Sequence, residues 1–308
     1  MAPPQDSEYA RCVQLSEQVS WAIDDVLSKE QLLDFSVPFL PESLASAQSV
    51  LRDPAEALRL NHIRAHSYVN LFVFVEEYIV AVAMQHAQAE QFGSSDALRA
   101  LLRFSDEEVK HQQLFRRFQM AFQQGFPTSC DVIDNAVEVA GFILSKSPLA
   151  IMLATLHLEL VTQQHYVGAF RAHDGLALEP HFKSLFKHHW IEEAQHAKID
   201  MLEIRKLAHD SPAESRTSAL ADYCDILRAF DGLLIRQADL DLESLDRALG
   251  RTLSTTERSN VHARQKAAYQ DAFLVAGVRH DQLLPYAQLL DPAAAESLSA
   301  LAHSWPQL

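Results

Sequence analysis

The chain contains few of the residues that interrupt helices. Its 308 residues include only 8 glycines and 12 prolines, whereas 48% are hydrophobic. Because glycine and proline are the strongest breakers of regular structure, this scarcity favours long helices. Apolar residues recur with the period of an α-helix, and no stretch shows the sustained alternation expected of a strand. We therefore predict an all-α protein.

Cysteine and positive charge are also scarce. Three distant cysteines argue against a disulfide framework and a thiolate metal site, and fit a reducing cytoplasm. A formal net charge of −15 argues against nucleic acid and anionic membrane surfaces as partners. The polar segment 1–11 predicts no signal peptide, and the most apolar run, 68–84, is short and interrupted by two glutamates. We expect a cytoplasmic protein that binds neither nucleic acid nor membrane.

Apolar periodicity and the breaks between periodic segments predict where the helices lie. Pro54 suits the first turn of a helix after Asp53, and Ser95 is the expected cap of the next helix. A first amphipathic segment is expected at about 7–27, an irregular connector at 34–48, and helices at about 54–91, 96–124, 132–144, 149–172, 181–208, 214–248, 255–276 and 292–303. We predict one domain, 1–308, in which a central bundle, about 54–208, is surrounded by the C-terminal helices, about 214–308.

Two Glu-x-x-His motifs, Glu108 to His111 and Glu193 to His196, are the first candidates for a functional site. Residues three apart project from one face of a helix, so each pair could reach one cation. A single such motif is more often a surface pair than a metal site. Both motifs, however, share a stripe with phenylalanines, where an unpaired carboxylate would be costly to bury.

Two further helices carry a glutamate in apolar surroundings: Glu159 on one, and either Glu76 or Glu77 on the other. The polar side of the second helix is marked by Arg64, Ser67, Asn70, Gln85 and Gln88. Glu76 points away from that side, so it is the predicted inward residue, and Glu77 lies at the polar margin.

The resulting order along the chain is Glu, Glu-x-x-His, Glu, Glu-x-x-His, with each unit on its own helix. This order is typical of ferritin-like di-iron and di-manganese bundles. Four carboxylates would balance the charge of two divalent cations, and oxygen and imidazole ligands suit iron or manganese.

We expect lesser roles for several neighbouring residues. Asp200, four residues after His196, could accept a hydrogen bond from a ligand histidine or be a solvated helix carboxylate. His188 and Glu192 are expected to be bystanders beside the ligand stripe. The other helical histidines are not expected to be ligands: His62, His66, His86, His157 and His165. The candidate walls of a substrate pocket, with core packing as the alternative, are Phe115, Phe118, Tyr166 and Phe170.

These motifs resemble those of the ferritin-like superfamily, most of whose di-metal members supply six ligands. Here His189 precedes Glu193 by one helical turn, and a His-x-x-x-Glu-x-x-His helix resembles the p-aminobenzoate N-oxygenase family of di-iron oxygenases. The resemblance covers about residues 50–210 by motif and the remainder by architecture. It implies seven metal ligands: Glu76, Glu108, His111, Glu159, His189, Glu193 and His196.

The resemblance also implies a ferritin-like four-helix bundle with flanking helices, and an activity. That activity is a di-iron monooxygenase with two iron ions, or manganese, dioxygen as co-substrate and an external electron donor or reductase. Its small-molecule substrate would be an amine, converted to hydroxylamine, nitroso or nitro products. The alternatives are hydroxylation, desaturation or oxidative decarboxylation at carbon, and a non-enzymatic iron oxidation and storage protein. A homodimer is expected by analogy.

Overall fold

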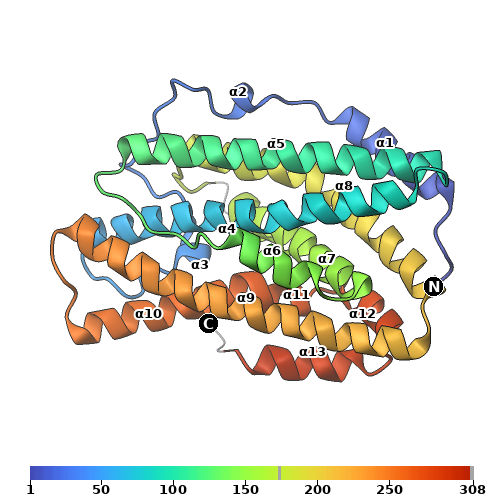
Figure 1. Ribbon diagram of the computed structural model, residues 1–308. Coiled ribbons are helices and arrows are strands. Elements are labelled where there is room, and N and C mark those ends of the chain that lie inside the picture. Colours follow the sequence, from blue (N-terminus) through green and yellow to red (C-terminus); the bar gives the residue numbers. More distant parts are fainter. Residues whose placement is uncertain (173–174, 306–308) are drawn as a thin grey trace.

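The computed structural model describes residues 1–172 and 175–305 (Figure 1). Within these two ranges the chain forms helices joined by loops, with no strand, which confirms the predicted all-α class. Segments η1 and η2 are π-helical. The elements are, in chain order, α1 (Asp6–Gln18), α2 (Ile23–Val26), α3 (Glu42–Ala45), α4 (Pro54–Ala89), α5 (Ser95–Gly125), α6 (Ala136–Leu144), α7 (Pro148–Gln164), η1 (His165–Arg171), α8 (Pro180–Asp210), α9 (Ala213–Leu249), α10 (Thr255–Gln270), η2 (Asp271–Val275), α11 (Ala276–Val278), α12 (Leu284–Leu290) and α13 (Ala294–His303).

Four of these helices, α4, α5, α7 and α8, carry the predicted ligands. Helix α4 packs along α5, α7 packs along α8, and α5 lies against α8. Helix α9 lies against both α4 and α7, and α12 contacts α7, α8 and α9 (Figure 1). Helix α1 covers α5 and α8 on the other side. The predicted ligand helices therefore meet in the interior, enclosed by the N-terminal and C-terminal helices.

The start of α4 follows the sequence prediction, whereas the start of α5 does not. Asp53 accepts hydrogen bonds from the backbone N–H groups of Ala55 and Glu56, and Pro54 occupies the first turn. For α5 the cap is Ser94, whose hydroxyl accepts from Ala97 N–H, and Ser95 is already helical. The prediction of Ser95 was wrong by one residue because two adjacent serines offer the same capping chemistry.

Other boundaries differ more. The segment predicted at 7–27 ends as α1 at Gln18 and resumes only as the single turn α2. The helix predicted at 132–144 begins at Ala136, because the preceding backbone is held to α9: Ile133 N–H donates to Gln237 Oε1 at 3.0 Å. The short helices α3 and α12 were not predicted. Of the predicted break at 173–180, residues 173 and 174 lie outside the described part of the chain.

Helix α4 is the one described helix long and apolar enough to cross a membrane by length and composition, and 72% of that apolar window is buried inside the protein. Its predicted polar side is also covered in its first half. Arg64 donates to the Gln265 carbonyl at 3.2 Å, and Ser67 donates to Asp241 Oδ1 at 2.6 Å. The first half of this polar side therefore contacts α9 and α10, whereas Gln85 and Gln88 in the second half are exposed.

Two buried histidines, His157 of α7 and His165 of η1, bind the C-terminal segment η2. The Nε2–H of His157 donates to the Phe273 carbonyl at 2.8 Å, and that of His165 donates to the Ala272 carbonyl at 2.9 Å. Each Nδ1 then accepts from a tyrosine hydroxyl, Tyr223 or Tyr68. Both rings are thus fully hydrogen-bonded in their neutral form. Their position explains why they are core residues and not part of the ligand cluster.

Candidate metal centre

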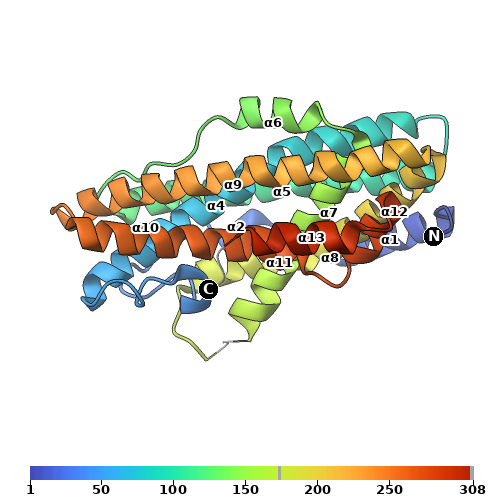
Figure 2. The same cartoon turned by 90° about the horizontal axis from the view of Figure 1, so that it is seen from below.

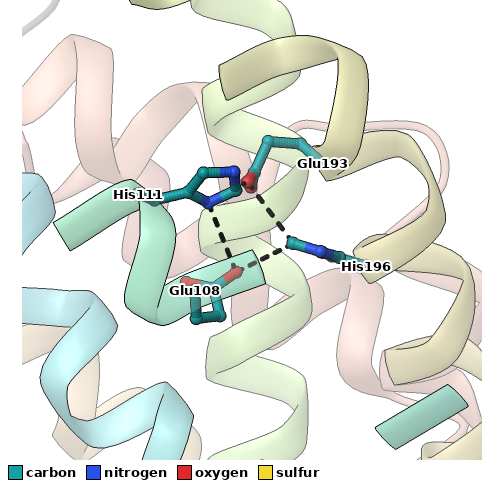
Figure 3. Close-up of side chains that lie close together, drawn as sticks. All are labelled: Glu108, His111, Glu193 and His196. Atoms are coloured by element: carbon teal, nitrogen blue, oxygen red, sulfur yellow. Dashed lines mark ion pairs between the residues drawn. The ribbon is translucent and has the colours of Figure 1, made fainter. Parts of the chain in front are cut away.

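The two Glu-x-x-His motifs meet in the interior. Glu108 and His111 of α5 face Glu193 and His196 of α8, and one donor atom from each lies within 4.8 Å of the others (Figure 3). All four side chains are buried. The closest approaches cross between the helices: His196 Nδ1 is 2.8 Å from Glu108 Oε1, and His111 Nδ1 is 3.3 Å from Glu193 Oε1. This buried group could hold a metal ion.

A second group of converging atoms adjoins the first. It consists of Glu76, His111 and His189, and it shares His111 with the first group. His189 Nε2 lies 3.1 Å from Glu76 Oε1 and 3.1 Å from Glu193 Oε1. Glu77 instead points outward, where it pairs with Arg116 at 2.9 Å and is partly exposed. The helical phase thus distinguished correctly between the two glutamates, and the ligand roles themselves stay predictions.

Glu159 of α7 is buried beside Glu193 but belongs to neither group of converging atoms. Thr162, on the same helix, donates to Glu193 Oε2 at 3.2 Å. Burial raises the pKa of Glu159 well above its ordinary value, and the Glu193 carboxylate raises it further. The side chain is therefore next to Glu193 without converging on either group.

Two carboxylates on the outer side of the cluster orient the histidines. The Nε2–H of His111 donates to Glu192 Oε2 at 2.8 Å, and the Nε2–H of His196 donates to Glu107 Oε2 at 2.9 Å. Each glutamate directly precedes a predicted ligand on the helix opposite its histidine. Such bonds fix the tautomer and leave Nδ1 free toward the cluster. The expectation that Glu192 is a bystander was wrong.

A signal for this pairing was present in the sequence. Both motifs read Glu-Glu-x-x-His, as residues 107–111 and 192–196. Two adjacent residues on a helix diverge by about 100°, so the first glutamate of each motif cannot share the face of the second. It reaches the neighbouring helix instead.

The inward atoms of the cluster lack hydrogen-bond partners. Buried polar atoms are normally hydrogen-bonded, so a set of orphaned atoms that face one another needs an explanation. These atoms are His111 Nδ1, His196 Nδ1, Glu76 Oε2, Glu108 Oε1, Glu159 Oε2 and Glu193 Oε1. Bound cations would satisfy carboxylate oxygens and imidazole nitrogens together, and this donor set fits a divalent ion such as iron or manganese.

Without metal, protons hold the cluster together. Burial raises the pKa of Glu76 well above its ordinary value despite the hydrogen bond from His189. Burial alone would lower the pKa of His189. The carboxylates of Glu193 and Glu76 outweigh the effect of burial and raise this pKa to about 10. The pKa of His196 is also raised well above its ordinary value. Burial opposes this rise, but the carboxylates of Glu107 and Glu108 outweigh burial. The metal-free site is therefore a mixture of imidazolium ions and protonated and ionised carboxyls.

Asp200 and the predicted pocket walls are placed differently from expectation. Asp200 is fully buried and neither oxygen has a hydrogen-bond partner, so it is not a solvated carboxylate, and the histidine acceptors are Glu107 and Glu192. Of the four predicted aromatic walls, Phe115 lies against His189 with ring centroids 5.0 Å apart. The other three pack on aromatic neighbours, as in the alternative reading: Phe118 on Phe182, Phe170 on Phe186, and Tyr166 on Trp190. Phe72, which was not predicted, also contacts His189.

No family model, curated protein or solved structure matches this chain.

Proposed function

We propose that the protein is a non-haem di-iron oxygenase of the ferritin-like type that oxygenates the nitrogen of an amine. The observation that supports this proposal is the set of orphaned donor atoms that converge from α4, α5 and α8, with the orphaned Glu159 Oε2 of α7 as an additional buried oxygen. The third histidine, His189, supports the specific comparison with p-aminobenzoate N-oxygenases, because it adds an imidazole next to Glu76.

The metal ions, their ligands, the two outer glutamates and the surrounding helices would each contribute differently to this reaction. Two iron ions supply the chemistry, which is activation of dioxygen with electrons from an external donor. Glu76, Glu108, Glu159, Glu193 and the three histidines would hold the ions. Glu107 and Glu192 keep Nδ1 of His196 and His111 turned inward. The surrounding helices exclude bulk water, since all seven predicted ligands are buried.

The test combines metal content with product analysis. The protein is reduced, loaded with ferrous iron, exposed to oxygen and incubated with a panel of amines, and products are identified by mass spectrometry. We expect about two irons per chain and gain of oxygen at nitrogen. Carbon-hydroxylated products alone would reassign the reaction to carbon oxidation, and a large hollow assembly that accumulates iron would indicate storage. Failure to bind iron would refute the proposal.

The role of His189 is tested separately, with its neighbour as a matched control. His189→Ala should change the visible spectrum of the iron-loaded protein, because it removes an imidazole from the cluster. His188→Ala should leave the spectrum unchanged, because the Nδ1–H of His188 donates to the Ser184 carbonyl of its own helix. Identical spectra for the two variants would remove the main support for the N-oxygenase comparison and leave the metal site intact.

A further inference from the structure

An apolar crevice lies on the face of the bundle where α6 and α9 bridge α4 and α7. Helices α4, α6, α7 and α9 all contribute to its lining, and every lining residue has an aliphatic or aromatic side chain. Tyr78 is the only described lining residue that has a polar side-chain atom. The crevice encloses about 30 Å³, enough for little more than one water molecule.

The crevice adjoins two helices, α4 and α7, that also carry predicted ligands. Leu158, in its wall, directly precedes the predicted ligand Glu159, and Tyr78 follows Glu76 by two residues. The Tyr78 hydroxyl is buried beside Thr155, where the charges of Asp200, Glu159 and Glu108 act on it. The Tyr78 ring thus faces the crevice while its hydroxyl lies toward the carboxylates.

Helix α6 lies on the outside of the bundle (Figure 2), and its side chains contribute to the lining of the crevice. Its inward side chains, Val139, Phe142 and Ile143, form one wall, whereas Val137 points outward and is 88% exposed. The backbone on both sides of α6 is fixed to α9: Ile133 N–H bonds Gln237, and Ser147 N–H bonds Asp222 at 3.1 Å. The helix between these anchors spans nine residues, and only Ile143 among them is buried.

We propose that α6 swings outward between its anchors, and that the crevice beneath it then binds the apolar, uncharged body of the substrate, with the reacting nitrogen directed past Tyr78 toward the metal cluster. This assignment rests on the proposed function and narrows its substrate class. A carboxylate, sulfonate or ammonium held in the crevice would have no partner, and burying such a charge is costly. The substrate is therefore a hydrophobic amine without an acidic group on the part that α6 covers.

The test uses two fluorescent probes that differ by one charge, and needs no iron. N-phenyl-1-naphthylamine is an uncharged hydrophobic amine, and 1-anilinonaphthalene-8-sulfonate is the same molecule with a sulfonate. The uncharged probe should bind saturably to the metal-free protein, at least about tenfold more tightly than the sulfonate, because the sulfonate would lose its hydration unpaired. Absence of saturable binding, or equal affinity for both probes, would overturn the proposal.

Substitutions on the two walls locate the bound probe. Val139→Trp, from α6, and Leu233→Trp, from α9, should each weaken binding of N-phenyl-1-naphthylamine about tenfold or more by filling the crevice. Val137→Trp adds the same side chain to the outer face of α6 and should bind the probe as the unchanged protein does. Circular dichroism identifies folded variants, and a folded wall variant with unchanged affinity contradicts the assignment.

Hydrogen exchange on the unsubstituted protein provides a measurement that does not depend on any variant. Binding of N-phenyl-1-naphthylamine should change exchange at 136–144 and leave 255–270 unaffected. Binding without a change at 136–144 would exclude the crevice. Iron loading and product analysis are separate readouts, so a protein that binds the probe but does not oxygenate amines would refute the function and keep the site.

Discussion

Glu107 and Glu192 show how single residues outside the predicted ligand set shape the site. Each is buried, and each receives the Nε2–H of a histidine from the opposite helix. The surroundings of Glu107 and Glu192 lower the pKa of both carboxyl groups and so favour their ionised form. Burial opposes ionisation of Glu107, but the hydrogen bond and charge of His196 lower its pKa to about 2. Glu192 also bonds Lys110 at 2.5 Å. The histidines are therefore aimed by carboxylates that are themselves fixed.

Removing one of these carboxylates should weaken metal binding without removing a ligand. Glu192→Ala frees the ring of His111, so we expect ferrous affinity to fall about 10-fold to 100-fold, measured by anaerobic titration. Glu192→Gln keeps an acceptor and should restore part of the affinity. The control is Glu77→Gln, which changes a partly exposed glutamate beside a predicted ligand. Equal affinities for Glu192→Ala and Glu77→Gln would show that Glu192 does not orient the site.

The protons of the metal-free cluster make metal binding depend on pH. The pKa of His189 is raised to about 10, so its ring holds a proton at neutral pH that a cation must displace, and burial raises the pKa of Glu76 as well. Affinity should therefore rise as pH increases from 6 to 8, and binding should release protons. Calorimetry in two buffers of different ionisation enthalpy counts those protons. His189→Ala should release about one fewer; a heat that is independent of buffer would contradict this description.

At the scale of elements, the attachment of the C-terminal helices to α7 depends on one glycine. A Cβ at Gly277 would lie 2.1 Å from His157 Nε2, and the His157 ring is held on both sides by Tyr223 and the Phe273 carbonyl. The ring cannot give way without breaking a buried hydrogen bond. The close approach of α11 to α7 therefore requires a residue without a side chain.

Gly277→Ala should lower the free energy of unfolding by about 1–3 kcal/mol, the range typical of overpacking in a core. The matched control is Gly232→Ala in α9, where a Cβ meets nothing within 4 Å. That change should raise stability by up to about 1 kcal/mol, because alanine favours the helix. Urea denaturation of both variants measures the difference. Similar stabilities would show that the helices readjust around His157.

At the scale of the whole molecule, the candidate metal site brings together helices from separate parts of the chain. Four glutamates from α4, α5, α7 and α8 converge in the interior, where their mutual repulsion opposes folding unless protons or cations compensate it. A ligand that binds only the folded state stabilises it by mass action. The stability of the bundle should thus depend on metal.

Ferrous or manganous ions should raise the melting temperature, and a chelator should reverse the effect. At a free metal concentration 100 times the dissociation constant, the gain is about 2.7 kcal/mol. Glu108→Ala should abolish the response, because Glu108 lies in the main group of converging atoms. Calorimetric scans with and without chelator make the comparison. A melting temperature that is insensitive to both ions would argue that the cluster is a structural network of protonated groups.

The sequence by itself determined the helical class, the long helices and the inward side of each motif. Apolar periodicity and the scarcity of helix breakers are local properties, so they can be recognised without knowledge of packing. The same periodicity separated Glu76 from Glu77, because residues adjacent on a helix point about 100° apart. Turn chemistry was less decisive: Ser94 and Ser95 offer the same cap, and only the backbone geometry of the folded chain distinguishes them.

Only the tertiary structure decided which neighbours each inward residue meets. The pairing of Glu107 with His196 and of Glu192 with His111 depends on the offset between α5 and α8, which no local pattern specifies. The burial of Arg64 and Ser67 follows from α9 and α10 lying across α4. The crevice under α6 likewise exists because α4, α6, α7 and α9 leave space between them when they pack. Helical phase fixes the direction of a side chain, whereas long-range packing fixes its partner.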